Sequence, residues 1–282
     1  ISVCHKDNGL DNIVKKLHED GVTLISTGGT QSLIESLGVP CQAVESLTTY
    51  PSILGGRVKT LHPKIFGGIL GRRDEQGDID QMKQYEIPEI DLVIVDLYPF
   101  EQTVASGAAE QDIIEKIDIG GISLIRAAAK NYKDVVIVAS QAQYKPLLDI
   151  LEKNGAQTTL DERKFFAKEA FAVSSNYDSH IFNWFDNNEE SALRISLNNP
   201  THLRYGENPH QKAVFYKFAN TKLEHTLAGS PCLQGKEISY NNMLDADAAW
   251  KAASDAYNSV ENVPNKVAVS VVKHLNPCGL AV

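Results

Sequence analysis

Apolar residues in the first half of the chain follow two alternating patterns. Short, β-branched runs occur at residues 22–26, 91–97 and 135–139. Segments with apolar residues at a helical period occur at 10–19, 30–37, 122–130 and 141–154. Alternation of strands and helices predicts a parallel sheet that is covered by helices on both faces, so we expect an α/β fold.

The pattern becomes wholly helical at residues 160–185, where a predicted apolar stripe comprises Phe165, Phe166, Ala170, Phe171, Val173 and Tyr177. The next stretch, 187–199, is polar and ends in Asn-Asn-Pro, which predicts a domain boundary. We therefore expect one domain at 1–198 and a second segment at 199–282. The second segment has a predicted strand at 214–218, a helix at 244–257 and a strand at 266–272.

Glycines and cations gather where the strands of the first domain are expected to end. Such clusters lie at 2–6, 26–30, 55–63 and 118–121, and the last leads into a helix that carries Arg126 and Lys130. Glycine lets main-chain N–H groups approach an anion, a helix N-terminus attracts it, and arginine or lysine neutralises it. Each cluster alone is also typical of an ordinary turn. Together they favour a site for a phosphate-bearing ligand.

Composition restricts the class of ligand and protein. The 282 residues carry a formal net charge of -9, which argues against a nucleic-acid partner and makes the basic loops a local feature. The four cysteines are far apart, so neither a zinc site nor a disulfide framework is indicated, and no metal is expected. No apolar run has the ~20 residues of a membrane span, and both ends of the sequence look cut.

Seven motifs identify a family resemblance that extends over essentially the whole chain. They are GGRVKTLHP (55–63), DLYPF (96–100), IDIGG (117–121), RAAAKN (126–131), LRYGENPHQ (203–211), SYNN (239–242) and KHLNPCG (273–279). In this order they resemble the N-terminal part of the bifunctional purine biosynthesis family, which joins an inosine monophosphate cyclohydrolase to an aminoimidazole carboxamide ribonucleotide (AICAR) transformylase. The resemblance implies a methylglyoxal synthase-like, Rossmann-type first domain, followed by part of a cytidine deaminase-like domain.

For the first domain, the resemblance implies cyclisation of formyl-AICAR to inosine monophosphate without a cofactor. It implies a phosphate cradle of Ser2, Lys6, Thr27, Gly29, Thr30, Arg57 and Thr60. The chemical residues would be Lys59, Tyr98, Asp118 and Lys130, helped by main-chain N–H groups near Gly120 and Gly121. We expect Asp118 and Lys130 to form a proton-transfer pair, because an adjacent carboxylate and ammonium shift each other's pKa.

Alternatives remain for single residues and for the whole domain. Asp118 is also suited to be a helix N-cap, and Tyr98 to be a half-buried aromatic at a strand end. The loop Cys4-His5-Lys6 departs from the family's usual Ser-Asp-Lys, and Asp96 stands where relatives often have asparagine. The first domain also resembles methylglyoxal synthase and a regulatory domain of carbamoyl phosphate synthetase, which share a phosphate-binding fold.

For the second segment, the resemblance implies transformylase residues. Lys273 and His274 would be catalytic, and Arg204, Tyr205 and Asn242 would bind AICAR, with 10-formyltetrahydrofolate as formyl donor. Asn276, Pro277 and Gly279 follow the pair and predict a turn there, so without the family match we expect the Lys-His pair to be solvated. The resemblance also implies a cytoplasmic homodimer whose transformylase site needs more chain than is present, so we expect no transformylase activity from these residues.

Overall fold

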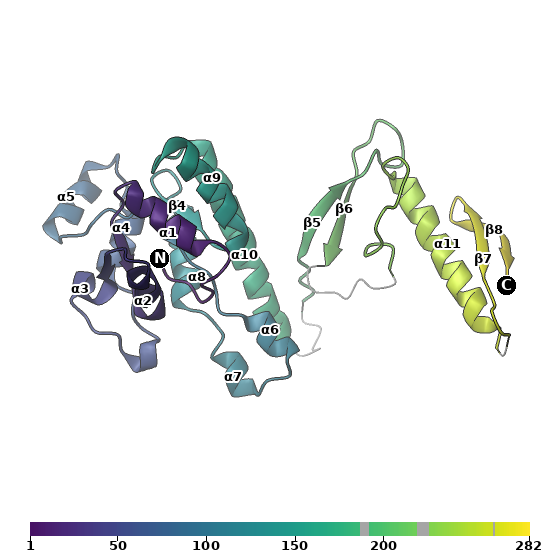
Figure 1. Ribbon diagram of the computed structural model, residues 1–282, viewed down its shortest axis with the longest axis horizontal. Helices are drawn as coiled ribbons and strands as arrows, with labels where there is room; N and C mark the ends of the chain where they lie inside the picture. Colours follow the sequence, from purple (N-terminus) through teal and green to yellow (C-terminus); the bar gives the residue numbers. More distant parts are fainter. Residues whose placement is uncertain (187–191, 219–225, 262) are drawn as a thin grey trace. The chain divides into compact units, whose positions relative to one another are not determined.

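The computed structural model describes residues 1–186, 192–218, 226–261 and 263–282. The chain divides into two compact units, Ile1–Arg194 and Ile195–Val282, which are drawn in Figure 1. The boundary expected between residues 198 and 199 lies inside strand β5 (Leu197–His202). Part of the polar stretch that predicts this boundary, residues 187–191, lies outside the described residues.

Two pairs of parallel strands form the centre of unit 1. Strand β1 (Leu24–Ser26) pairs with β2 (Cys41–Ala43), and β3 (Leu92–Ile94) pairs with β4 (Val136–Val138). Strand β4 is buried along its whole length, as expected for a parallel strand with both faces covered. The parallel α/β class predicted from the sequence is thus confirmed, although the strands are shorter than the apolar runs that predict them.

The first residues of the chain connect the two strand pairs. The amino group of Ile1 donates to the carbonyl oxygen of Ile25 over 2.8 Å. On the other side, the Ser2 N–H donates to the carbonyl oxygen of Ile94 over 2.8 Å, and Ser2 forms a parallel bridge with Val95. Residues 1–3 therefore lie between β1 and β3, so the loop that follows them starts at the carboxyl edge of the sheet.

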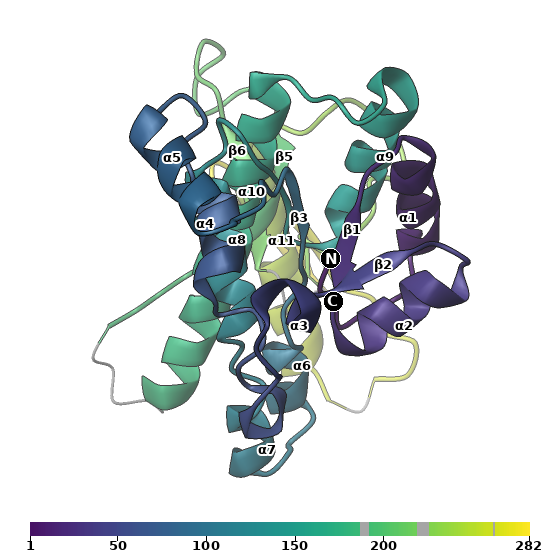
Figure 2. The same ribbon diagram turned by 90° about the vertical axis from the view of Figure 1, so that its left-hand side faces the viewer.

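Helices cover both faces of these strands. The helical elements of unit 1 are α1 (Leu10–Glu19), α2 (Gly28–Ser36), α3 (Val44–Thr48), η1 (Leu54–Gly56), α4 (Pro63–Leu70), α5 (Gln76–Gln84), α6 (Phe100–Ala105), α7 (Glu110–Ile114), α8 (Gly120–Lys130), η2 (Gln141–Gln143), α9 (Tyr144–Asn154) and α10 (Leu160–Asp186). Helix α1 packs on α9, and α8 packs on α10, on opposite sides of the strands (Figure 2). Helix α1 buries Leu10, Ile13, Val14 and Leu17, which is the spacing of one helix face.

The apolar stripe predicted on α10 is partly wrong. Phe166, Ala170 and Tyr177 are buried, at successive spacings of four and seven residues that place them on one face. Phe165 and Phe171 are 44% and 42% exposed, because each lies directly beside a buried position and so points away from the core. The helix therefore buries a narrower face than its aromatic content suggests.

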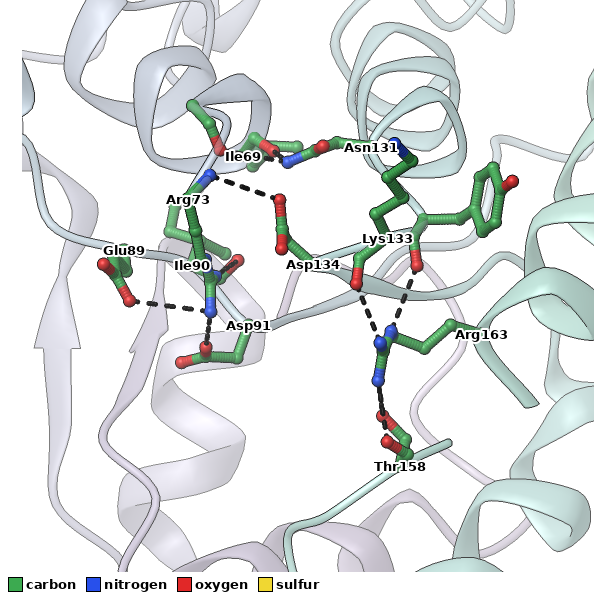
Figure 3. Close-up of polar contacts among 12 residues, drawn as sticks. Ile69, Arg73, Glu89, Ile90, Asp91, Asn131, Lys133, Asp134, Thr158 and Arg163 are labelled. Atoms are coloured by element: carbon green, nitrogen blue, oxygen red, sulfur yellow. Dashed lines mark hydrogen bonds and ion pairs between the residues drawn. The ribbon is translucent and has the colours of Figure 1, made fainter. Parts of the chain in front are cut away.

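Polar contacts fasten the edge of the sheet at which β3 and β4 begin (Figure 3). The Arg73 guanidinium donates to the Asp91 carboxylate over 2.7 Å. The main-chain N–H of Arg73 donates to the Asp134 carboxylate over 3.5 Å. The side chain of Asn131, directly after α8, donates to the carbonyl oxygen of Ile69 over 2.8 Å. These contacts place the C-terminal end of α8 at the amino edge of β3 and β4.

The described residues of unit 2 form two antiparallel strand pairs and one helix. Strand β5 pairs with β6 (Val214–Phe218), and β7 (Val269–Lys273) pairs with β8 (Asn276–Ala281). Helix α11 (Tyr240–Ser259) lies against β7 and β8. Gly206 and Ser239 are the only buried residues among those of unit 2 whose burial is described. Unit 2 therefore has much less core than unit 1.

The turn between β7 and β8 differs from the sequence-based expectation. Asn276 and Pro277 were expected to form a turn, but they begin β8. The turn is formed by His274 and Leu275, which have φ values of 50° and 63°. Two residues with positive φ match the right-handed twist of a tight hairpin, even though neither side chain is typical of that conformation.

Candidate active site

The N-terminus of α2 forms the first part of the candidate site. Thr27 is the extended N-cap residue after β1, and Gly28 has a φ of 55° that favours glycine. A Cβ atom on Gly29 would lie 2.5 Å from Nζ of Lys6, so the lysine ammonium rests on the first turn of the helix. An ammonium beside unpaired N–H groups and the positive end of a helix is suited to bind a phosphate.

Two hydroxyls expected in the phosphate cradle have protein partners instead. The Thr30 hydroxyl donates to the carbonyl oxygen of Val3 over 3.0 Å and accepts from the Val3 N–H over 3.2 Å. The Thr27 hydroxyl donates to the Glu45 carboxylate over 2.9 Å. In this structure, both threonines hold loops at the cradle in place, and their hydroxyl protons are not directed at a ligand.

The glycine-rich loop around η1 carries the other cations. Gly55 and Gly56 have φ values of 65° and 90°, and a Cβ on Gly56 would lie 2.9 Å from Cε of Lys59. The lysine stem therefore packs on a surface that only glycine leaves open. Arg57 is exposed and forms an ion pair with Glu115, a partner that the sequence motif did not predict.

Thr60 connects this loop to the N-terminus of α8. Its hydroxyl oxygen would lie 3.4 Å from a Cβ on Gly120, the first residue of the helix. The Gly121 N–H donates to the Asp118 carboxylate over 2.6 Å. In this structure it is therefore not free to donate to a substrate oxyanion, in contrast to the expectation from the sequence. Asp118 thus accepts from an N–H group in the first turn of α8, as an N-cap side chain does, although the N-cap position itself is Ile119.

Asp118 and Tyr98 lie together at this helix end. Burial raises the pKa of Asp118 above its ordinary value of 3.8, against the effect of hydrogen bonds from the main-chain N–H groups of Gly121, Tyr98 and Ile122. Burial raises the pKa of Tyr98 as well, with further contributions from the charges of Asp118 and Cys4. The Tyr98 ring is 44% exposed, and Nζ of Lys116 lies 5.7 Å from its centroid. A half-buried carboxyl and an exposed phenol therefore lie at the same end of α8.

Lys130 does not join this group. It ends α8, whereas Asp118 precedes the same helix, and about 15 Å of axis separate Gly120 from Lys130 at about 1.5 Å per residue. The polar contacts of Figure 3 place that end of α8 at the amino edge of β3 and β4, while Tyr98 follows their carboxyl edge. The expected Asp118–Lys130 proton-transfer pair is therefore wrong within one chain.

In unit 2, three predicted AICAR-binding residues gather at the start of α11. The Arg204 guanidinium donates to the Tyr205 hydroxyl over 3.0 Å, and the Tyr240 N–H donates to the carbonyl oxygen of Tyr205 over 3.0 Å. Asn242 pairs with the N-cap Ser239, whose hydroxyl donates to its side-chain oxygen over 2.8 Å. Each predicted ligand group thus has a local partner.

Lys273 and His274 are exposed residues at the β7–β8 turn. The turn is held to α11 because the Leu275 N–H donates to Asp245 over 2.9 Å. The turn with the Lys-His pair is therefore attached to the helix that carries Asn242. The described residues do not enclose the pair.

Three further residues at the site were not predicted as ligands. The carboxylate of Asp96 accepts hydrogen bonds from the main-chain N–H groups of both Cys4 and His5, and it contacts the His5 ring. The sequence marked these positions only as departures from the family pattern. Their contact joins residues that are 91 or 92 positions apart, which no local motif reveals.

A cavity of about 130 Å³ lies between β1 and β3, behind the phosphate cradle. Its lining includes Ser2, Thr27 and Thr60 but none of Lys6, Lys59, Tyr98, Asp118 or Lys130. It is thus an apolar space inside the fold rather than the place of the chemistry. Within the part of the chain that the structure describes, no three His, Cys, Asp or Glu side chains are arranged to hold a metal, and no helix is long and apolar enough to cross a membrane.

Comparison with known proteins extends the resemblance to relatives and to a solved fold. "Bifunctional purine biosynthesis protein PurH" of Bacteroides thetaiotaomicron is 64% identical over 281 residues, covering 100% of this chain and 52% of the relative. The protein of the same name from Listeria monocytogenes is 45% identical over 287 residues, covering 100% of this chain and 54% of the relative. The chain thus spans about half the length of these relatives. A solved structure described as "Crystal structure of ForH" has a TM-score of 0.57 and 31% identity, over 67% of this chain and 96% of that one.

Two family models divide the chain between them. The model described as "MGS-like domain" matches residues 9–123, which contain the α2 cradle, the η1 loop and the Asp118 end of α8. The model described as "AICARFT/IMPCHase bienzyme" matches residues 128–282, more than half of the chain. The chain therefore belongs to the AICARFT/IMPCHase bienzyme family.

Proposed function

We propose that unit 1 cyclises formyl-AICAR to inosine monophosphate in purine biosynthesis. The observation that supports this most strongly is the juxtaposition of Asp118 and Tyr98 at the N-terminus of α8, on the same edge of the sheet as Lys6 and the N-terminus of α2. A ribonucleotide has a phosphate at one end and a reacting base at the other. The N-terminus of α2 is suited to bind the phosphate, and the N-terminus of α8 is suited to act on the base.

Ring closure requires that a poor nucleophile lose a proton. The carboxamide nitrogen attacks the formyl carbon, a C–N bond forms, and the formyl oxygen becomes an oxyanion that leaves as water after two protonations. Asp118 is suited to accept the nitrogen's proton, because its raised pKa makes the carboxylate a stronger base than an ordinary aspartate. The carboxylate also accepts from the N–H groups of Gly121, Tyr98 and Ile122, so the proton would go to a lone pair that these three donors leave open.

The oxyanion needs nearby donors or positive charge. Tyr98 offers a phenol whose pKa is raised, so it stays protonated and can donate. Lys59 offers an ammonium on the loop that meets α8 through Thr60. Lys6, Arg57 and the N–H groups at Gly29 would bind the 5′-phosphate, with Ser2, Thr27, Thr30 and Thr60 supporting the loops. Lys130 has no part in this scheme.

The remaining proposals concern the whole protein. In it, Lys273 and His274 would transfer a formyl group from 10-formyltetrahydrofolate to AICAR, which Arg204, Tyr205 and Asn242 would bind. The whole protein would be a cytoplasmic homodimer. The name shared by the relatives, a bifunctional purine biosynthesis protein, and the family model that matches residues 128–282 support the proposal of two activities.

Ligand-dependent thermal stability tests the proposed function of unit 1. Inosine monophosphate should raise the melting temperature of the chain, because a ligand that binds only the folded state stabilises it by mass action. Dihydroxyacetone phosphate is the matched comparison, since a methylglyoxal synthase acts on a triose phosphate. Stabilisation by the triose phosphate but not by the nucleotide would favour the lyase. Stabilisation by the nucleotide with no cyclisation of formyl-AICAR would favour a regulatory domain.

A further inference from the structure

Asp96 makes an unusually complete set of contacts with the loop that follows residues 1–3. Its side chain, directly beyond β3, is only 8% exposed. One carboxylate oxygen accepts the Cys4 N–H, and the other accepts the His5 N–H over 2.9 Å. The second oxygen also lies 2.9 Å from Nδ1 of the His5 ring. A single carboxylate therefore fixes both the backbone and the ring of His5.

These contacts determine which ring nitrogen of His5 carries the proton. An ionised carboxylate can only accept, so Nδ1 donates to Asp96 and Nε2 bears the lone pair of the neutral ring. None of the described residues forms a hydrogen bond with His5 Nε2, and 45% of the side chain is exposed. Because Asp96 holds Nδ1, the ring can exchange a proton with a substrate only through Nε2.

The same loop lies between the two helix ends of the candidate site. Lys6 rests on Gly29 at the N-terminus of α2. On the other side, burial raises the pKa of the Cys4 thiol, and the charges of Asp96, Lys116 and Asp118 also act on it. His5 is thus held between the residues proposed to bind the phosphate and those proposed to act on the base.

We propose that His5 is a proton donor for the departing hydroxyl and that Asp96 is the positioning residue that holds it. This inference rests on the proposed cyclisation. Protonated His5 gives its Nε2 proton to the hydroxyl formed from the formyl oxygen, the C–O bond breaks, and water leaves. Before this, Asp118 takes the proton of the carboxamide nitrogen and passes it to the oxyanion, which becomes the hydroxyl. As the C–O bond breaks, a C=N bond forms, and the regenerated Asp118 carboxylate takes the proton of the other ring nitrogen and releases it to solvent, so the step needs no further reactant. The neutral ring then regains a proton from solvent.

Steady-state kinetics of single and double variants test the pair. Asp96→Asn and His5→Gln should each lower kcat for formyl-AICAR cyclisation about 10- to 100-fold, with KM changed by less than about threefold. The double variant should be no slower than the slower single variant, because Asp96 acts through His5. Asp7→Asn removes a neighbouring charge that contacts Gln141 instead, and it should keep kcat near wild type. Losses that multiply in the double variant, or a change in KM alone, would overturn the inference.

Nitrogen-15 NMR of the histidine rings gives a readout that needs no turnover. In the full chain, His5 should be the Nδ1–H tautomer, and Asp96→Asn should shift it toward Nε2–H while circular dichroism confirms folding. A wild-type His5 with Nε2 protonated and Nδ1 bare would overturn the positioning by Asp96. A wild-type chain that makes no inosine monophosphate would refute the proposed function and the donor role together, whereas the tautomer would still decide the role of Asp96.

Discussion

At the scale of single residues, Asp118 accepts a hydrogen bond at the N-terminus of α8 and is also the proposed general base. The pH dependence of stability tests how burial affects its carboxyl group. Because burial raises its pKa in the folded state above the ordinary 3.8, the folded chain holds this proton more tightly than the unfolded chain. The resulting stabilisation is present below that ordinary value and is lost as pH rises through the raised pKa. Asp118→Asn abolishes this titration.

The melting temperature of Asp118→Asn relative to wild type should therefore increase between pH ~3.5 and pH ~7. Its turnover should fall at the same time, because an amide cannot accept the proton. Differential scanning calorimetry across this pH range makes the comparison. A melting-temperature difference that stays constant with pH would show that Asp118 is not perturbed by burial.

Arg57 is expected to contribute binding rather than chemistry. In the structure it pairs with Glu115, an exposed partner that a phosphate can displace at little cost. Arg57→Ala should raise KM about tenfold or more and change kcat less, since a phosphate contact stabilises ground and transition states alike. Glu115→Gln is the matched control and should lower KM or leave it unchanged. A fall in kcat alone for Arg57→Ala would assign the arginine to the chemical step.

At the scale of elements, Lys6 can lie against the α2 N-terminus because residue 29 is a glycine and has no Cβ atom. Gly29→Ala places a Cβ where Lys6 Nζ lies, and the flexible lysine must move away. Affinity for inosine monophosphate should fall about tenfold, the scale of one charge-assisted hydrogen bond, while stability holds or rises because alanine favours a helix. Gly77→Ala in α5 has open space around it and should leave affinity unchanged. Calorimetric titration of both variants with inosine monophosphate measures the two affinities. Equal affinities for Gly29→Ala and Gly77→Ala would show that Lys6 does not contribute to the phosphate cradle.

Element prediction from sequence succeeded where periodicity was long. The helix predicted at 10–19 is α1 with the same bounds, because four buried residues define one face. The helices α3, α6 and α7 have five or six residues, too few for a period to emerge. The β7–β8 turn was misplaced because Asn276 and Pro277 are typical turn residues, whereas His274 and Leu275 are not.

The candidate site was predictable only where glycine and charge are adjacent in sequence. The α2 and η1 loops fit that description, since Lys59 packs on Gly56 within its own motif. Asp118 and Lys130 also share adjoining motifs, but the helix between them separates them. The contact of His5 with Asp96 depends on how β3 is placed beside residues 1–3, which is a property of the folded sheet.

At the scale of the whole molecule, the two units differ in what they can support. Unit 1 buries an extended core, whereas the Lys273-His274 turn of unit 2 is exposed. A formyl transfer needs both substrates held to within a fraction of an ångström of the reacting geometry. This chain should therefore release no tetrahydrofolate from 10-formyltetrahydrofolate and AICAR above background. Release that Lys273→Ala abolishes would show that unit 2 builds a working site by itself.

Cyclisation of formyl-AICAR, followed as inosine monophosphate by chromatography in the presence of a chelator, tests the central claim most directly. The wild-type chain and Lys273→Ala should form inosine monophosphate at similar rates, since the proposed site lies wholly in unit 1 and uses no metal. Asp118→Asn should be slower by about two orders of magnitude or more, the scale of a lost general base. Product formation that survives Asp118→Asn, or that disappears with Lys273→Ala or with the chelator, would contradict the account.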